Sequence, residues 1–302
     1  MAFFGTVFAC QGAKGLRMNY ELALDYESIF RDRLVIITGA ARSGTTLLGK
    51  IVGSMQPSYF LFESTIMKLI SALPERLLPM LLFEDYFLPK IQGYNLNLNE
   101  ADDSCEFNYR DKESIWASPR TRADAIRLIE EKKPLFIIKA TEFQPLFDRA
   151  VKVFPGLRFI NITRNGNDVL NSSINHGWFG DEYKPVDILV DGCPWYIDDE
   201  SRKVWSKWNP VTRAACVWRT CVEYPITSLY LIRQLKYEHL LLDAQSHARK
   251  LAELLGLGIM KITEKHIADI HLAPCYPSIF GSIQEPEKAK YAVAMEKLEY
   301  QI

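Results

Sequence analysis

The chain has 302 residues, of which 48% are hydrophobic and 24% are charged, and this composition excludes a largely disordered protein. Its 36 Lys and Arg residues against 37 Asp and Glu residues give a formal net charge of −1, which excludes the overall positive field typical of nucleic-acid-binding proteins. No stretch reaches the roughly 18 consecutive apolar residues of a membrane-spanning helix, so we expect no transmembrane segment.

Short apolar, β-branched runs alternate with helical segments in the first half of the chain. Such runs show no polar–apolar alternation, which is typical of parallel strands covered on both faces. The predicted strands span 33–39, 59–63, 134–140 and 157–163, and the predicted helices span 45–55, 121–133, 144–154 and 165–175.

The remaining segments are less regular. Residues 64–92 have a helical pattern interrupted by prolines, and 93–118 are polar and aperiodic. Residues 176–210 are rich in Gly, Pro, Asp and Trp and predict a long loop, a feature that in compact domains is often functional. Further predicted elements are a helix over 211–231, a short strand over 235–238 and a helix over 244–255 that ends at Gly256.

A glycine-containing loop joins the first predicted strand to its helix. It reads Gly39-Ala-Ala-Arg-Ser-Gly-Thr-Thr46, and in this position glycines, inward-pointing amides and the positive helix N-terminus favour a phosphate-like anion. The loop departs from the nucleotide-triphosphate signature because Thr45 stands where a lysine is expected, while Arg42 supplies a cation earlier. A structural turn with no ligand is the alternative interpretation.

The residues Ala-Arg-Ser-Gly-Thr-Thr-Leu-Leu of this loop resemble the 5′-phosphosulfate loop of sulfotransferases that use 3′-phosphoadenosine 5′-phosphosulfate (PAPS). The arginine version resembles the tyrosylprotein and bacterial branches of that family. The resemblance implies a P-loop-type three-layer α/β/α fold with a central, mainly parallel sheet of about five strands, and PAPS as cosubstrate with no metal. By resemblance the cofactor-binding residues of this loop are Arg42, Ser43, Gly44, Thr45, Thr46 and Leu47.

A second candidate anion site follows the fourth predicted strand. Arg164 ends that strand and Ser172 follows eight residues later, and an arginine fork with a hydroxyl suits a phosphate dianion. The pair resembles the family's 3′-phosphate motif. Tyr237, in Tyr-Glu-His-Leu, resembles the tyrosine near the adenine, with His239 in place of the usual aspartate. Ser278 belongs to a degenerate counterpart of the C-terminal cofactor loop, whose Gly-x-Trp is missing here.

Sulfuryl transfer needs a base for the acceptor proton and cations near the leaving phosphate. Glu63 lies 21 residues after Arg42 at the end of a predicted strand and resembles the catalytic glutamate of the tyrosylprotein branch. Lys139 ends the third strand, 25 residues before Arg164, like a cleft lysine of the same branch. The predicted catalytic residues are therefore Glu63, Arg42 and Lys139, with His176 as the alternative base and His239 as a weaker one.

The sequence predicts a PAPS-dependent sulfotransferase that acts on a hydroxyl-bearing acceptor. The alternatives are a P-loop nucleotide kinase or NTPase, and a non-catalytic nucleotide-binding protein of the same fold. We expect one domain over 1–302, with a tail or helix over 1–30 and loop or lid insertions at 93–118 and 176–210. The six cysteines form no CxxC pair, so we expect free thiols and a cytoplasmic location. The acceptor and the oligomeric state stay open.

Overall fold

A central sheet of five parallel strands organises the computed structural model, and the predicted α/β fold class is confirmed. The strand order is β2-β3-β1-β4-β7, so β1 lies in the middle between β3 and β4. The strands are β1 (Leu34–Thr38), β2 (Ser58–Phe62), β3 (Leu135–Lys139), β4 (Arg158–Thr163) and β7 (Leu231–Lys236). The structure describes residues 21–62, 70–71, 73–92, 121–180, 189–190, 192–224, 230–270 and 276–301.

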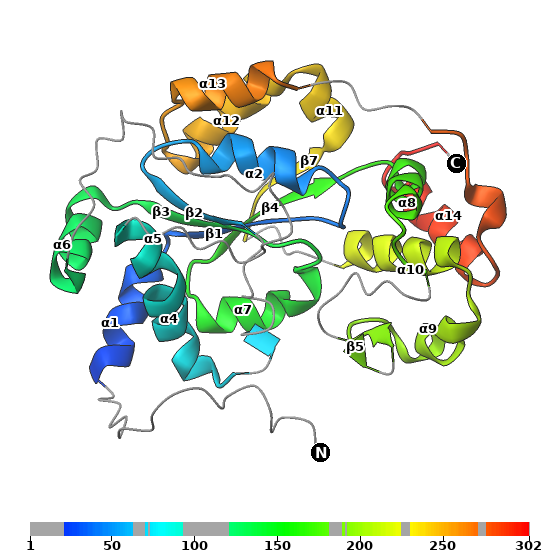
Figure 1. Ribbon diagram of the computed structural model, residues 1–302, viewed down its shortest axis with the longest axis horizontal. Helices are drawn as coiled ribbons and strands as arrows, with labels where there is room; N and C mark the ends of the chain where they lie inside the picture. Colours follow the sequence, from blue (N-terminus) through cyan, green and yellow to red (C-terminus); the bar gives the residue numbers. More distant parts are fainter. Residues whose placement is uncertain are drawn as a thin grey trace.

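Helices cover both faces of the sheet, as parallel strands require (Figure 1). On the upper face in Figure 1, α2 and α12 bury an apolar cluster that includes Val35, Ile37 and Leu251. The helices on this side are α2 (Thr45–Gly53), α11 (Tyr237–Leu242), α12 (Ala244–Leu255) and α13 (Lys261–Ala268).

The opposite face is packed with aromatic side chains. Phe30, Phe87, Phe136 and Phe154 meet with ring centroids 4.8–5.8 Å apart in the pairs that they form. The elements on this side include α1 (Glu21–Phe30), α4 (Leu78–Leu81), the π-helix η2 (Leu82–Phe87), α5 (Leu88–Gln92), α6 (Arg122–Lys132) and α7 (Phe147–Val153), with short 3-10 turns η1 (Glu75–Leu77) and η4 (Gln144–Leu146).

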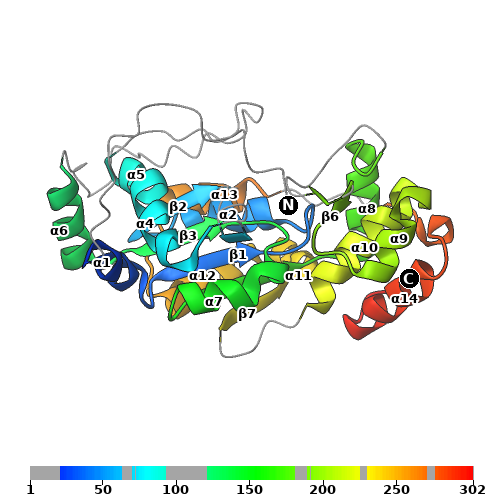
Figure 2. The ribbon, with the colours of Figure 1, turned by 90° about the horizontal axis from the view of Figure 1, so that it is seen from below.

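A third apolar cluster lies beside the sheet, next to β4, where both views show a group of helices at one end of the molecule (Figures 1 and 2). Trp218 and Tyr291 pack at its centre with ring centroids 5.1 Å apart, and Ala40 of the glycine loop belongs to it. Its elements are α8 (Gly166–Asn175), α9 (Asp199–Val204), η5 (Trp205–Lys207), α10 (Pro210–Glu223), η6 (Phe280–Ser282) and α14 (Glu287–Lys297).

Three predicted segments differ from the structure. The segment 176–210, predicted as a long loop, contains the short antiparallel pair β5 (Leu189–Val190) and β6 (Cys193–Pro194), α9 and η5. The helix predicted over 211–231 ends at Glu223, and the last strand begins at Leu231 instead of Leu235. The sequence prediction passed over Pro225, which follows Tyr224 directly, and a proline disfavours the helical conformation at the residue before it.

Candidate functional site

The loop between β1 and α2 has the geometry of an anion cradle. Gly44 precedes α2 in a left-handed conformation with φ of 91°, and the first turn of α2 contains no acidic residue. The Ser43 hydroxyl is buried and has no hydrogen-bond partner within the described part of the chain. A buried polar atom left unpaired at the N-terminus of a helix suits an anionic ligand that accepts its hydrogen. Thr45, Thr46 and Leu47 form the first helical residues beyond it.

Gly44 also permits a close approach by Tyr237. A Cβ atom on Gly44 would overlap the ring carbons of Tyr237, which stands at the first position of α11. The sequence analysis placed Tyr237 on the last strand, and this prediction is wrong, because β7 ends at Lys236, one residue earlier. Burial raises the pKa of the Tyr237 hydroxyl above its ordinary value. The structure thus brings the predicted adenine tyrosine against the predicted phosphosulfate loop.

Arg164 joins the three predicted motifs. Its Nη1 atom donates to the backbone oxygen of Arg42 at 3.2 Å, and its Cζ atom lies 4.7 Å from the centroid of the Tyr237 ring. Asp168 pairs with it at 3.7 Å, and Arg164 itself is only 7% exposed. Its Nε atom is buried without a hydrogen-bond partner in the described residues. We call Arg42, Arg164, Ser172 and Tyr237 the arginine cluster.

Ser172 lies on α8 and contacts the loop directly. The Nε atom of Arg42 donates to the Ser172 hydroxyl at 3.0 Å, so two residues 130 positions apart in sequence meet at the carboxyl edge of β1 and β4. Arg42 has a positive φ of 68°, an uncommon conformation for a residue with a side chain. Strained backbone of this kind is concentrated at functional sites, because surrounding contacts must hold it in place.

The C-terminal segment around Ser278 docks on the same helix. The side chain of Asn167 donates to the backbone oxygens of Tyr276 and Pro277 at 3.4 and 3.2 Å, and accepts from the Ile279 amide at 2.7 Å. Asn171 donates to Pro277 at 3.1 Å. Ser278 is exposed beside α8, and its hydroxyl accepts a long hydrogen bond from the Phe280 amide.

The sequence model of the sulfotransferase family matches residues 35–260, which is most of the chain and includes every element of the arginine cluster. The chain belongs to the sulfotransferase family. It is therefore a transferase. No curated protein sequence matches it.

Solved sulfotransferases have a similar fold. Sulfotransferase STF9 from Mycobacterium avium has 12% sequence identity and a TM-score of 0.50, over 94% of this chain and 82% of that one. The sulfotransferase domain of the Synechococcus PCC 7002 olefin synthase has 16% identity and a TM-score of 0.49, over 89% and 95% of the two chains. The sulfotransferase domain from the curacin biosynthetic pathway has 14% identity and a TM-score of 0.47, over 89% and 98%. At these identities the likeness concerns the fold alone.

Lys139 is buried at the carboxyl end of β3. It is 1% exposed, and its Nζ atom lies 4.4 Å from the centroid of the Phe62 ring. Phe62 is the last residue of β2, so the ammonium group is held beside the end of the neighbouring strand. Glu63 is the next residue in sequence and lies outside the described residues. The predicted lysine thus lies buried at the carboxyl end of its strand, while the position of the predicted base Glu63 stays a prediction.

His176, the alternative base, is engaged at both ring nitrogens. Its Nδ1 atom bonds the backbone oxygen of Ser172 at 2.8 Å, and its Nε2 atom lies 3.0 Å from Nη2 of Arg42. Because a carbonyl oxygen only accepts, Nδ1 carries the hydrogen and Nε2 accepts from the guanidinium. The lone pair of Nε2 is therefore directed to the guanidinium of Arg42 in this structure. His239 is exposed on α11 and makes no contact with the arginine cluster among the described interactions.

A buried carboxylate that the sequence analysis did not single out lies beside the loop. Glu142 has a positive φ of 57°, is 6% exposed, and donates its amide hydrogen to Gly39 at 2.9 Å. Its Oε2 atom accepts from the Tyr196 hydroxyl at 2.7 Å. The contact ties the predicted loop 176–210 to the base of the glycine loop. No spacing rule predicts it, because the partners are 54 residues apart and Tyr196 belongs to an irregular segment.

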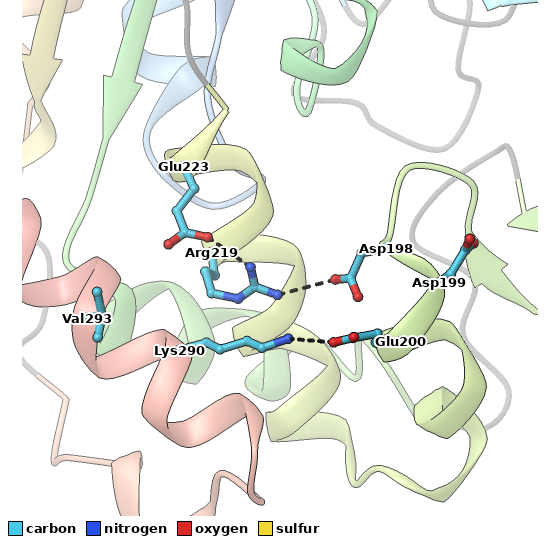
Figure 3. A pocket seen from close by; sticks show the side chains of 7 residues that line it. All are labelled: Asp198, Asp199, Glu200, Arg219, Glu223, Lys290 and Val293. Carbon is cyan, nitrogen blue, oxygen red and sulfur yellow. Dashed lines mark hydrogen bonds and ion pairs between the residues drawn. The ribbon is translucent and has the colours of Figure 1, made fainter.

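A cavity of about 550 Å³ lies apart from these motifs, between α9, α10 and α14 (Figure 3). Its lining is an ion-pair network. Arg219 pairs with Asp198 at 3.6 Å and with Glu223 at 2.9 Å, and Lys290 pairs with Glu200 at 3.9 Å. None of the lining residues comes from the segments that directly follow β1, β3, β4 or β7. The cavity therefore lies between helices and does not form part of the arginine cluster.

Among the described residues, no group of three or more His, Cys, Asp or Glu side chains is arranged to hold a metal ion. Nor does the described part of the chain contain a helix with the length and apolarity needed to cross a membrane.

Proposed function

We propose that this sulfotransferase moves the sulfuryl group of PAPS to a hydroxyl-bearing acceptor. The observation that supports it is the contact of three motifs through one side chain. Arg164 bonds the backbone of Arg42 and lies over Tyr237, while Arg42 bonds Ser172. Ligands of open α/β sheets bind at this carboxyl edge, and here cations, a hydroxyl and an aromatic ring are gathered there.

The residues present fit a ligand with two anionic groups and a purine. Two buried polar atoms, the Ser43 hydroxyl and Nε of Arg164, have no hydrogen-bond partner among the described residues. Ser43 belongs to the glycine loop and Arg164 to the motif after β4. In the proposal the loop from Ser43 to Leu47 holds the 5′-phosphosulfate, and Arg164 with Ser172 holds the 3′-phosphate. Tyr237 contacts the adenine, and Ser278 borders the 3′ side beside α8.

PAPS supplies an activated sulfuryl group carried on a phosphate. Lys139 stabilises negative charge as that phosphate leaves, because a buried ammonium acts strongly where water is excluded. Glu63 accepts the proton from the acceptor hydroxyl. Arg42 adds positive charge from the loop. These assignments agree with the absence of a lysine at position 45. In the proposal Arg42 and Lys139 supply the positive charge that a magnesium ion supplies in a nucleoside-triphosphate site.

The experiment is calorimetry with 3′-phosphoadenosine 5′-phosphate (PAP) and with ATP plus magnesium. We expect PAP to bind without added magnesium and to raise the midpoint of thermal unfolding by mass action. A preference for ATP with magnesium would favour the nucleotide kinase or NTPase instead. Binding of PAP without sulfuryl transfer to any acceptor, in a panel of phenols, alcohols, sugars and tyrosine peptides with labelled PAPS, would favour a non-catalytic nucleotide-binding protein.

The organisation of residues 1–302 as one domain is part of the proposal. The family match ends at residue 260, while α14 at Glu287–Lys297 packs on α10 within the cluster beside the sheet. A shared core of this kind predicts one cooperative unfolding transition. The cytoplasmic location and the acceptor's chemical class stay predictions.

A further inference from the structure

The segment that follows α14 lies against the turn between β4 and α8. Tyr300 donates its hydroxyl hydrogen to Oε2 of Glu238 at 3.0 Å, across 62 residues of sequence. Oε1 of the same carboxylate accepts from the backbone amide of Asn165 at 2.8 Å. One side chain of α11 therefore connects the residue that caps α8 with the segment after α14.

The turn at the end of α14 directs Tyr300 to this place. Glu299 has a left-handed φ of 58°, and its amide donates to the Glu296 carbonyl at 2.8 Å. The Tyr300 amide donates to the Met295 carbonyl at 3.0 Å. These two bonds form a Schellman motif, which ends a helix and reverses the chain. The position of Tyr300 is therefore fixed by the backbone as well as by its bond to Glu238.

Both residues that flank Tyr237 contact this C-terminal turn. Lys236 precedes Tyr237, and its Nζ atom lies 5.0 Å from the centroid of the Tyr300 ring, a cation–π distance. The same Nζ atom pairs with Glu299 at 3.3 Å. Glu238 follows Tyr237 and accepts the Tyr300 hydrogen bond. The backbone on either side of Tyr237 is thus attached to the segment after α14.

The residues held in this way are sequence neighbours of two members of the arginine cluster. Asn165 directly follows Arg164, and Lys236 and Glu238 flank Tyr237. The Cζ atom of Arg164 lies 4.7 Å from the centroid of the Tyr237 ring. Because the Glu238 carboxylate is bonded to the backbone of Asn165, it fixes the separation of the two segments that carry this arginine and this tyrosine.

We propose that Glu238 and Tyr300 are positioning residues for donor binding. Glu238 holds the segments of Arg164 and Tyr237 at the separation that the nucleotide requires, and Tyr300 holds the Glu238 carboxylate in place. The inference rests on the proposed function, and neither side chain touches the ligand in it. It extends the donor site to a part of the chain beyond residue 260, where the family match ends.

The test is the affinity for PAP, measured by calorimetry at a temperature where unfolding curves show every variant to be folded. Tyr300→Phe keeps the ring, removes the hydroxyl and is expected to weaken PAP about 3–10-fold. Glu238→Ala removes both hydrogen bonds and is expected to weaken PAP about 10–30-fold. Wild-type affinity in both variants would overturn the inference.

Rescue and coupling separate positioning from a general effect on the fold. Glu238→Gln keeps an oxygen for the Asn165 amide, and its nitrogen can donate to the Tyr300 oxygen, so PAP should bind within about threefold of wild type. In a Glu238→Ala background, Tyr300→Phe should weaken PAP by less than about twofold more, because Tyr300 acts through that carboxylate. Failure of Gln to restore affinity, or losses that multiply in the double variant, would overturn the positioning role.

Tyr224→Phe is the matched control. The Tyr224 hydroxyl donates to Asp148 at 3.2 Å, which is also a phenol–carboxylate bond between distant segments, and neither residue belongs to the arginine cluster. PAP affinity should be unchanged in this variant, and a loss as large as that of Tyr300→Phe would overturn the inference. Failure of the wild-type protein to bind PAP would overturn the proposed function, whereas PAP binding that is insensitive to Tyr300 and Glu238 would overturn this inference only.

Discussion

The ring of Tyr237 lies directly against the backbone of Gly44, in the space that a Cβ atom at that position would occupy. Gly44 is 193 residues away in sequence and caps α2, while Tyr237 begins α11. The contact therefore joins the loop after the central strand β1 to the start of the helix that directly follows the edge strand β7. The absence of a side chain at Gly44 thus allows the glycine loop and Tyr237, two parts of the proposed donor site, to lie in contact.

Gly44→Ala should disturb both the loop and the Tyr237 ring. The left-handed φ and the overlap with the ring together predict a loss of about 1–2 kcal/mol in the free energy of unfolding. We also expect PAP affinity to fall at least about tenfold, because the loop amides move. Urea unfolding and calorimetry measure the two effects. Gly281→Ala is the matched control, since a Cβ there meets no atom within 4 Å.

Arg164→Ala should weaken PAP by about 2–4 kcal/mol, because a buried charged donor to a phosphate is lost. AMP should bind the variant nearly as it binds the wild-type protein. Loss of the contact to the Arg42 backbone should lower the melting temperature by a few degrees, which scanning calorimetry measures. Equal weakening of both nucleotides would contradict the assignment of Arg164 to the 3′ side.

Glu63→Gln keeps the shape of the side chain and removes its ability to accept a proton. We expect turnover to fall about 10²–10⁴-fold with PAP affinity unchanged. Lys139→Met is the informative comparison, because loss of a buried ammonium should lower both turnover and PAP affinity. Steady-state assays with labelled PAPS, combined with calorimetry, separate the two patterns. A Glu63→Gln enzyme with normal turnover would exclude Glu63 as the base.

Glu287→Gln should destabilise the fold strongly. Glu287 is fully buried and accepts from Nε of Arg219 at 2.6 Å. Burial alone would lower the pKa of Arg219, but the hydrogen bond and charge of Glu287 outweigh it and hold that pKa above its ordinary range. Removing one partner of a buried ion pair costs about 3–5 kcal/mol, and the two remaining carboxylates on Arg219, Glu223 and Asp198, are partly exposed and compensate its charge less well.

The control for Glu287 is its more exposed neighbour. Glu223→Gln removes a second of the carboxylates that pair with Arg219. The Glu223 side chain is 32% exposed, and the change should cost about 0–1 kcal/mol. Urea unfolding of the two variants gives the comparison. Equal losses in the free energy of unfolding would show that the buried Glu287 stabilises the contact between α10 and α14 no more than the partly exposed Glu223 does.

Alkaline pH should destabilise the protein through its buried thiols. Among the described residues Cys193, Cys216 and Cys221 are free and buried. Burial raises the pKa of Cys193 to about 11 and that of Cys216 to about 12. The unfolded thiol ionises near pH 8.5, so the native state holds its proton longer and the stabilisation is lost as pH rises from there through 11.

The size of this effect can be measured with one variant. Between pH 8 and 10 the Cys193 contribution to the free energy of unfolding should fall by about 1–2 kcal/mol. Cys193→Ala should flatten the pH slope by that amount, whatever its effect on stability at pH 8. Urea unfolding at both pH values measures the slopes. Identical slopes for the two proteins would mean that the native thiol ionises as readily as the unfolded one.

The local pattern of apolar residues was sufficient to predict most of the strands and helices of the sheet. The strands β1, β3 and β4 were predicted within one residue at either end, because continuous β-branched runs between helices have few other structures open to them. The helix before Gly256 also ends as predicted, with Gly256 in the left-handed conformation at φ of 68°. By contrast, Tyr237 was placed on a strand and begins a helix, since a short run gives no periodicity to distinguish the two.

Residue types at the strand ends identified the donor motifs, since glycine, arginine and serine spacings follow from the chemistry of binding an anion. Their mutual contacts were decided by the tertiary structure. Nothing in the sequence directs Arg42 to Ser172 and His176, 130 and 134 residues away, in preference to the loop that carries it. Nor does any local signal pair Glu142 with Tyr196. Side-chain direction depends on which strands become neighbours and which helix packs beside them, and those are properties of the assembled core.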